Sequence, residues 1–152
     1  MRRFWRRPRR LAVYCDGAIG DRGEGTGLGV IVRDERGEII GLVKRTLPPM
    51  TNNEAEYAAL VLALEAAWHF RPRRLEVYMD SEVVIGQMQG RFAVHSPALR
   101  RWHVRACRLA RRFREVTYHH IPREANRLAD ALAGEALAEA LKEGKHVRRR
   151  QL

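Results

Sequence analysis

Four acidic residues lie in four separate parts of the chain, where packing alone explains a negative charge poorly. Asp16 and Asp80 end two similar apolar runs, LAVYCD and LEVYMD. Glu56 lies within the apolar helical stretch TNNEAEYAALVLALEAA, and Asp130 lies near the start of another, NRLADALA. Carboxylates that meet in one cleft repel one another unless divalent cations hold them together. The pattern therefore predicts a magnesium site, and carboxylates around magnesium indicate phosphate chemistry.

Each acid also has a structural explanation when it is considered alone. Asp16 suits a turn before a glycine, Asp80 suits a helix cap, and Asp130 suits the amino terminus of a helix. Glu56 has no basic residue three or four positions further on, so its alternatives are an edge position that reaches water or a distant arginine partner. These separate explanations do not predict the combination, which favours a shared site.

The composition is typical of one globular domain with a buried core. No apolar run approaches the roughly 20 residues that a membrane span needs. A secretory signal is not expected either, because Asp16 interrupts the short apolar stretch after the basic amino terminus. The two cysteines, Cys15 and Cys107, are far apart among core-like residues and are interpreted as buried free thiols. We therefore expect a cytoplasmic protein with no membrane partner.

The net charge of +11 is concentrated in particular segments of the chain. Residues 1–10 carry six arginines and no acid, and residues 145–150 carry four basic residues. We expect a basic amino-terminal arm at 1–10, a folded domain at 11–143 and a basic carboxy-terminal tail at 144–152. From Arg91 to Arg114 the chain carries eight arginines and no acid. A basic stripe beside an acidic cluster suits a bound polyanion, while disordered arms and a solvated helix face are the alternatives.

Apolar periodicity predicts the element order β-β-β-α-β-α-α-β-α. Strands are expected at residues 11–16, 27–34, 38–46, 75–79 and 116–120, with a hairpin turn at 34–37. Helices are expected from a capping box at Thr51 and Glu54 to about Phe70, at 81–89, at 97–113, and from Asn126 to about Leu141, ended by Gly144. Residues 17–27 are expected to form a glycine-rich loop. This alternation predicts a mixed α/β sheet, with its active site at the carboxyl ends of parallel strands.

Four short motifs surround the acids. In chain order they are Cys15-Asp16-Gly17, Thr51-Asn52-Asn53 followed by Glu56, Asp80-Ser81, and His120 followed by Asn126 and Asp130. This set resembles ribonuclease H, type 1, over residues 11 to about 140. The resemblance implies a ribonuclease H-like fold, with a five-stranded mixed sheet of order 3-2-1-4-5, the first three strands antiparallel, flanked by helices. It also implies an endonuclease that cuts the RNA strand of RNA/DNA hybrids.

The resemblance implies a role for each matched residue. The metal-binding catalytic acids are matched by Asp16, Glu56, Asp80 and Asp130, and the histidine that assists turnover is matched by His120. Contacts to nucleic acid are expected from Asn53 in the minor groove and from Asn52, Gly17, Ser81, Asn126 and Arg91. Two Mg²⁺ ions about 4 Å apart, with Mn²⁺ as a substitute, would activate water and stabilise the leaving 3′-oxygen, giving 5′-phosphate and 3′-hydroxyl products. Contacts with 2′-hydroxyls would distinguish RNA, and no feature indicates base-specific recognition.

The sequence also departs from the family pattern. The loop after Asp16, GDRGEGTG, differs from the asparagine- and proline-containing loop of many members, which leaves its phosphate contacts open. Residues 87–92 lead almost directly to the 97–113 helix, as in the short-form branch that lacks a basic protrusion. Arg91 and the arginine stripe, or the arginine arms, would then supply the hybrid-binding surface.

Two other functions agree with parts of the sequence. One is a nucleic-acid-binding module that keeps the fold without catalysis, and the other is a transposase-like or exonuclease relative. The complete set of four acids disfavours the first, and the motifs around Asp80 and Asp130 disfavour the second. We therefore expect a monomer that acts on RNA/DNA hybrids, with double-stranded RNA as a further substrate that the short-form branch suggests.

Overall fold

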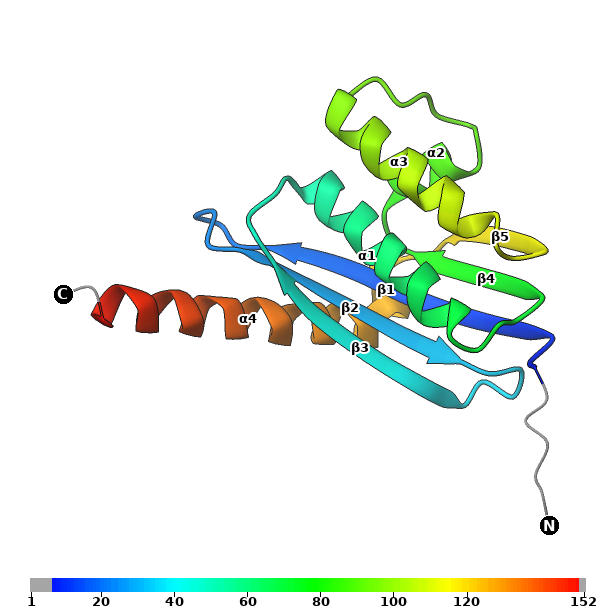
Figure 1. Cartoon of the computed structure of the whole chain (residues 1–152), viewed down its shortest axis with the longest axis horizontal. Helices are drawn as coiled ribbons and strands as arrows, with labels where there is room; N and C mark the ends of the chain where they lie inside the picture. Colours follow the sequence, from blue (N-terminus) through cyan, green and yellow to red (C-terminus); the bar gives the residue numbers. More distant parts are fainter. Residues whose placement is uncertain (1–6, 151–152) are drawn as a thin grey trace, which may run out of the picture.

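One five-stranded mixed sheet organises the chain, in the order β3-β2-β1-β4-β5 (Figure 1). The computed structural model describes residues 7–150, with side chains described as far as residue 143. Strands β1 and β2 and strands β2 and β3 are antiparallel, whereas β4 is parallel to both β1 and β5. The expected fold class and strand order are therefore confirmed. The elements are β1 (Arg10–Ile19), β2 (Thr26–Arg33), β3 (Ile39–Leu47), α1 (Asn52–Trp68), β4 (Arg74–Met79), α2 (Glu82–Met88), α3 (Pro97–Ala110), β5 (Glu115–His120), the 3₁₀ helix η1 (Arg123–Asn126) and α4 (Arg127–Arg150).

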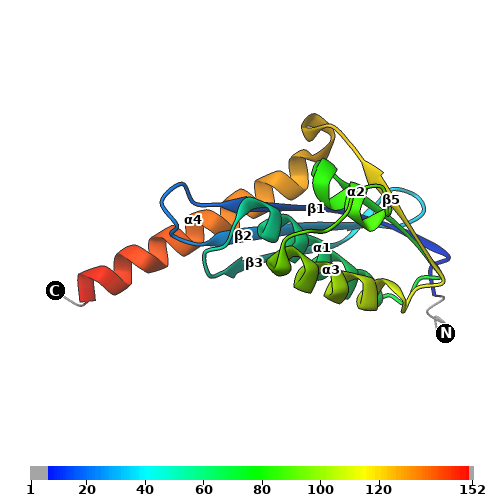
Figure 2. The same cartoon turned by 90° about the horizontal axis from the view of Figure 1, so that it is seen from above.

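Helix α1 lies between the sheet and α3 and is buried on nearly every side (Figure 2). The same core includes three alternating residues of β1, namely Leu11, Val13 and Cys15. Thr51 begins the helix as predicted, because its Oγ1 accepts the N–H of Glu54 at 3.3 Å. The helix therefore has a fixed start and little freedom to move relative to the sheet.

Two boundaries differ from the sequence expectations. Strand β1 continues to Ile19, because Gly17, Ala18 and Ile19 pair with β2, so the glycine-rich loop is shorter than residues 17–27. Helix α4 does not end at Gly144 but continues to Arg150. A glycine inside a helix costs only about 1 kcal/mol, so Gly144 alone does not stop a helix. Within the described residues, no helix is both long and apolar enough to cross a membrane. Cys15 is a buried free thiol, and Cys107 is a half-buried one.

Helix α4 packs on the face of the sheet opposite α1 and contacts β2 through glycines (Figure 2). A Cβ atom added at Gly29 would lie 2.3 Å from the carbonyl oxygen of Ala129 and 2.7 Å from the nitrogen of Ala133. At Gly27, an added Cβ would lie 2.1 Å from the carbonyl oxygen of Ala133. Only glycine permits this backbone approach, which sets the position of α4 relative to the sheet.

Replacing Gly29 with alanine is expected to displace α4 and to lower the free energy of unfolding by about 2–4 kcal/mol, because backbone atoms cannot move aside locally. Gly134→Ala is the matched control, because nothing lies within 4 Å of an added Cβ at that helical position. It should be neutral or stabilising by up to about 1 kcal/mol. Guanidinium denaturation of both variants checks the difference, and equal stabilities would contradict the packing argument.

Candidate active site

Asp16 and Asp80 leave neighbouring parallel strands side by side. The register of β1 and β4 pairs Tyr14 with Tyr78, and each aspartate lies two residues further along its own strand direction. Asp80 follows the end of β4, whereas Asp16 lies within β1 because that strand continues beside β2. Both are at the carboxyl end of the parallel part of the sheet, as predicted.

Glu56 reaches the same place from the first turns of α1. The backbone N–H of Gly17 donates a hydrogen bond to Glu56 Oε1 at 3.0 Å. A Cβ at Gly17 would lie 2.4 Å from the carbonyl oxygen of Ala55, so β1 passes directly against the helix start. This close approach requires glycine and places Glu56 next to Asp16.

Three of the four predicted acids form one cluster. Carboxylate oxygens of Asp16, Glu56 and Asp80 all lie within 4.8 Å of one another, and Asp16 and Glu56 are each only 6% exposed. Asp130, in the first turn of α4, shares a hydrogen bond with Asp16, but its side chain is 43% exposed. Its Oδ1 lies 3.9 Å from Arg123 Nη2, an ion pair that the sequence did not reveal. The fourth acid therefore borders the cluster.

The buried acids hold protons unusually strongly. Burial, followed by the charge of Glu56, raises the pKa of Asp16 from 3.8 to about 9. Burial also raises the pKa of Glu56, to about 7, although hydrogen bonds from Asp16 and from the Gly17 N–H oppose the shift. A divalent cation would replace the shared protons, and carboxylate oxygens are the ligands that Mg²⁺ prefers. The donor set therefore fits the metal that the sequence predicted.

Asn126 holds Asp80 in place from inside the protein. It is 2% exposed, and its amide nitrogen donates to the Cys15 carbonyl oxygen at 3.0 Å and to Asp80 Oδ1 at 3.1 Å. Its own Oδ1 has no hydrogen-bond partner among the described residues. Sequence reasoning assigned Asn126 to nucleic-acid contact and missed this positioning role. The position of Asn126 just before α4 could have indicated this role, because η1 brings the chain back to the ends of β1 and β4.

The remaining predicted residues surround the cluster. Ser81 Oγ accepts the N–H of Val84 at 3.3 Å and so caps α2. Asn52 is exposed and Asn53 half-buried at the start of α1, four and three residues before Glu56, respectively. Arg91 is exposed, and its Nε donates to Gln89 Oε1 at 2.7 Å.

The two neighbouring histidines differ in their surroundings. His120 ends β5, is exposed and makes no described side-chain contact. His119 bonds through Nε2 to Glu76 Oε2 at 2.5 Å and stacks on Tyr78, with ring centroids 4.7 Å apart. Strand alternation predicted opposite faces for the two side chains, and only His119 is held in contacts of this kind.

Comparisons with known proteins match this chain to members of one family. Residues 14–136 match a family model described as reverse transcriptase-like. Ribonuclease HI of Halobacterium salinarum is 39% identical over 131 residues, covering 86% of this chain and 66% of that protein. A bifunctional protein of Mycobacterium tuberculosis is 34% identical over 129 residues, covering 84% of this chain and 35% of that protein. The chain thus spans about two thirds and about one third of the length of these curated relatives.

Solved structures of three proteins are similar to this chain over most of its length. The crystal structure of RNase H1 from Halobacterium salinarum has a TM-score of 0.82 and 38% identity, covering 86% of this chain and 98% of that one. The N-terminal RNase H domain of the Mycobacterium tuberculosis protein has a TM-score of 0.84 and 32% identity, with 88% and 97% covered. LC11-RNase H1, solved in complex with an RNA/DNA hybrid, has a TM-score of 0.81 and 34% identity, with 86% and 99% covered.

Without metal, the stability of the protein is expected to fall as pH rises from about 4 towards 9. The folded state keeps a proton on Asp16 up to a pKa of about 9, whereas the unfolded state loses it near 3.8. The folded state therefore binds more protons across this window, and its stability decreases with pH. Asp16→Asn should flatten this dependence and stabilise the metal-free protein at pH 8 by roughly 1–3 kcal/mol.

Guanidinium denaturation in EDTA at several pH values measures this effect. Saturating Mg²⁺ should oppose the decrease in the wild-type protein and have a smaller effect in the variant. The same pH slope for both proteins in EDTA would contradict the assigned cause.

Proposed function

Because the chain belongs to the type 1 ribonuclease H family, we propose that it cuts the RNA strand of RNA/DNA hybrids internally. The observation that carries this proposal is the cluster of Asp16, Glu56 and Asp80, whose ligand oxygens lie within 4.8 Å of one another. Such a cluster repels a nucleic acid unless cations are bound, so it serves phosphate hydrolysis better than simple binding. The hybrid in the LC11-RNase H1 structure supports the substrate class.

The acids would hold Mg²⁺, two ions when substrate is bound, with Mn²⁺ as a substitute. Asp16, Glu56 and Asp80 provide the inner ligands, and Asp130 contributes from the edge of the cluster. When bound, the cations would supply charge stabilisation for the attacking water and the leaving 3′-oxygen, so that the products carry 5′-phosphate and 3′-hydroxyl ends.

The chain itself orients these ligands before any cation arrives. The Gly17 N–H fixes one oxygen of Glu56, and the Asn126 amide fixes one oxygen of Asp80. Both contacts leave the second carboxylate oxygen free of a described hydrogen bond to the backbone. Burial of Asp16 and Glu56 limits access of bulk water, which strengthens their electrostatic interactions. The protein therefore contributes a pre-oriented set of oxygens.

The hybrid would lie across the start of α1, where Asn52 and Asn53 can present amides to 2′-hydroxyls in the minor groove. The Gly17 and Ser81 segments border the acids, and Arg91 offers a phosphate contact. Binding through phosphates makes cleavage largely independent of sequence and sensitive to salt. Double-stranded RNA as a further substrate, a monomeric state and a cytoplasmic location complete the proposal.

Asp80→Asn is expected to lower cleavage of a 5′-labelled RNA/DNA hybrid by about 1000-fold or more, because a neutral amide is a poor cation ligand. Glu82→Gln is the matched control, since Glu82 is an exposed acid two residues away and should retain activity. Gel analysis of products in Mg²⁺, Mn²⁺ and EDTA measures the effect. Hybrid binding without cleavage in either metal would favour a catalytically weak nucleic-acid-binding module instead.

His120→Ala is expected to lower kcat by about 100-fold and to change KM little, if His120 assists proton transfer during turnover. His119→Ala is its matched control, because His119 is held by Glu76 and Tyr78. Steady-state kinetics on the same hybrid separate the two positions. A loss caused by His119→Ala but not by His120→Ala would reverse the assignment.

A further inference from the structure

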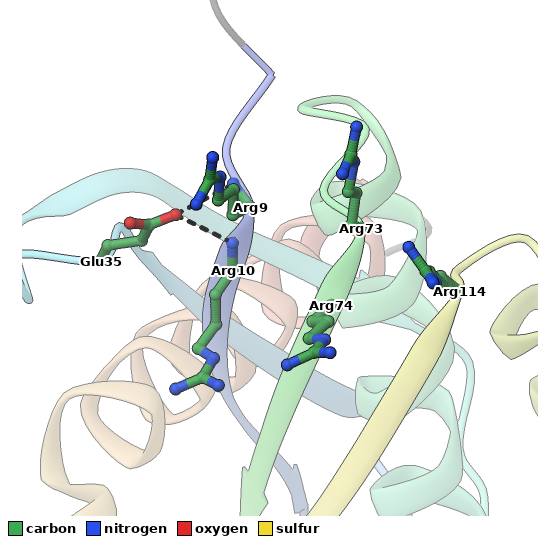
Figure 3. Close-up of a pocket in the computed structure, with 6 residues that line it drawn as sticks. All are labelled: Arg9, Arg10, Glu35, Arg73, Arg74 and Arg114. Carbon is green, nitrogen blue, oxygen red and sulfur yellow. Dashed lines mark hydrogen bonds between the residues drawn. The ribbon is translucent and has the colours of Figure 1, made fainter.

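Apart from the carboxylate cluster, the structure has a charged pocket at the opposite end of the sheet. It has a volume of about 690 Å³ and is lined by Arg9, Arg10, Glu35, Arg73, Arg74 and Arg114 (Figure 3). These arginines lie at the starts of β1, β4 and β5, whereas Asp16 lies two residues beyond the part of β1 that pairs with β4, and Asp80 follows the end of β4. Six residues of β4, at about 3.3 Å each, separate Arg74 from Asp80 by roughly 20 Å. A ligand in this pocket therefore does not touch the acids.

Two of the five arginines have acidic partners. Arg10 Nε lies 3.8 Å from Glu76 Oε1, and Arg74 Nε lies 3.3 Å from Glu115 Oε2. The acid inside the pocket, Glu35, instead accepts hydrogen bonds from the backbone N–H groups of Arg9 and Arg10, at 2.9 and 3.1 Å. Its charge therefore fixes the start of β1 rather than pairing with a guanidinium group.

The other three guanidinium groups remain available. Among residues 7–143, no carboxylate pairs with the side chain of Arg9, Arg73 or Arg114. In Figure 3 the side chains of Arg9 and Arg73 extend beyond the strand ends, away from the sheet. Such groups bind phosphate oxygens well, because each presents several N–H donors in a planar fork.

The backbone holds these three arginines close together. The Arg74 N–H donates to the Arg9 carbonyl oxygen at 2.9 Å, and the Arg114 N–H donates to the Arg73 carbonyl oxygen at 3.0 Å. Because neighbouring strands lie about 4.8 Å apart, the three strand starts span about 10 Å. Like charges fixed at this spacing repel one another, and an anion with several phosphates relieves that repulsion.

We propose that this pocket is a second nucleic-acid-binding site, which holds backbone phosphates away from the catalytic acids. Phosphates are favoured over bases as the recognised group. On the neighbouring sheet face, Tyr14 stacks on Tyr78 and Tyr78 on His119, each pair with ring centroids 4.7 Å apart, so these rings already cover one another. A long polyanion is favoured over a single phosphate group, because the arginines come from three strand starts that span about 10 Å.

The test measures binding of the full chain in EDTA, so that no cation at the acids can bind phosphate. The probes are a fluorescein-labelled 12-nucleotide single-stranded DNA, followed by anisotropy, and ATP, followed by calorimetry. Arg73→Ala and Arg114→Ala each remove one free guanidinium group. Arg45→Ala, at an exposed position on β3 without a described ion pair, removes the same charge outside the pocket.

Each pocket variant should weaken DNA binding about 5-fold or more and reduce the slope of log K against log salt by about 1, whereas Arg45→Ala should change the affinity less than about 2-fold. Thermal unfolding confirms that the variants fold, and Arg73→Lys should retain most of the binding if charge is what matters. DNA affinities that match those of Arg45→Ala would overturn the proposal. Weakened binding of ATP alone would also overturn it, by assigning the pocket to a free polyphosphate.

Discussion

Three carboxyl groups whose oxygens lie within 4.8 Å of one another would repel each other if all were ionised, so without a cation the buried pair Asp16 and Glu56 retain protons above their usual pKa values. The surrounding structure holds the three groups together against this cost. The parallel register of β1 and β4 brings Asp16 and Asp80 side by side. The buried packing of α1 fixes Glu56. Each of the three acids is thus attached to, or directly follows, an element that packs in the core. Cation binding would remove the unfavourable repulsion among the ionised acids of the cluster.

Close backbone contacts matter as much as side chains in this arrangement. Gly17 lets β1 pass against the start of α1, and Gly27 and Gly29 let α4 lie directly on β2. The contact at Gly17 brings Glu56 next to Asp16. The contacts at Gly27 and Gly29 set the distance between Asp130 and the sheet. Positions without a side chain therefore help to determine where the four acids lie. The absence of a Cβ atom at these glycines therefore shapes the site.

Local patterns in the sequence were sufficient for the element order and the helix cap at Thr51, because strand alternation and capping depend on near neighbours. The sheet order followed only from the resemblance to a known family. The continuation of β1 to Ile19 depends on pairing with β2, which overrides the loop preference of Gly17. The contact of Asn126 with Asp80 and the pairing of Asp130 with Arg123 depend on how η1 docks. The arginines of the charged pocket come from three distant segments, so no local pattern indicates it.

The shared register of β1 and β4 also limits how this chain can change over generations. Side chains alternate between the two faces of a strand, so deletion of one residue within β4 would turn Asp80 away from Asp16. Substitutions in the core can be absorbed by repacking, but a change of length there cannot. Lineages of this protein should therefore tolerate insertions in the 89–96 connection and the 20–25 loop, while the length of β4 remains constant.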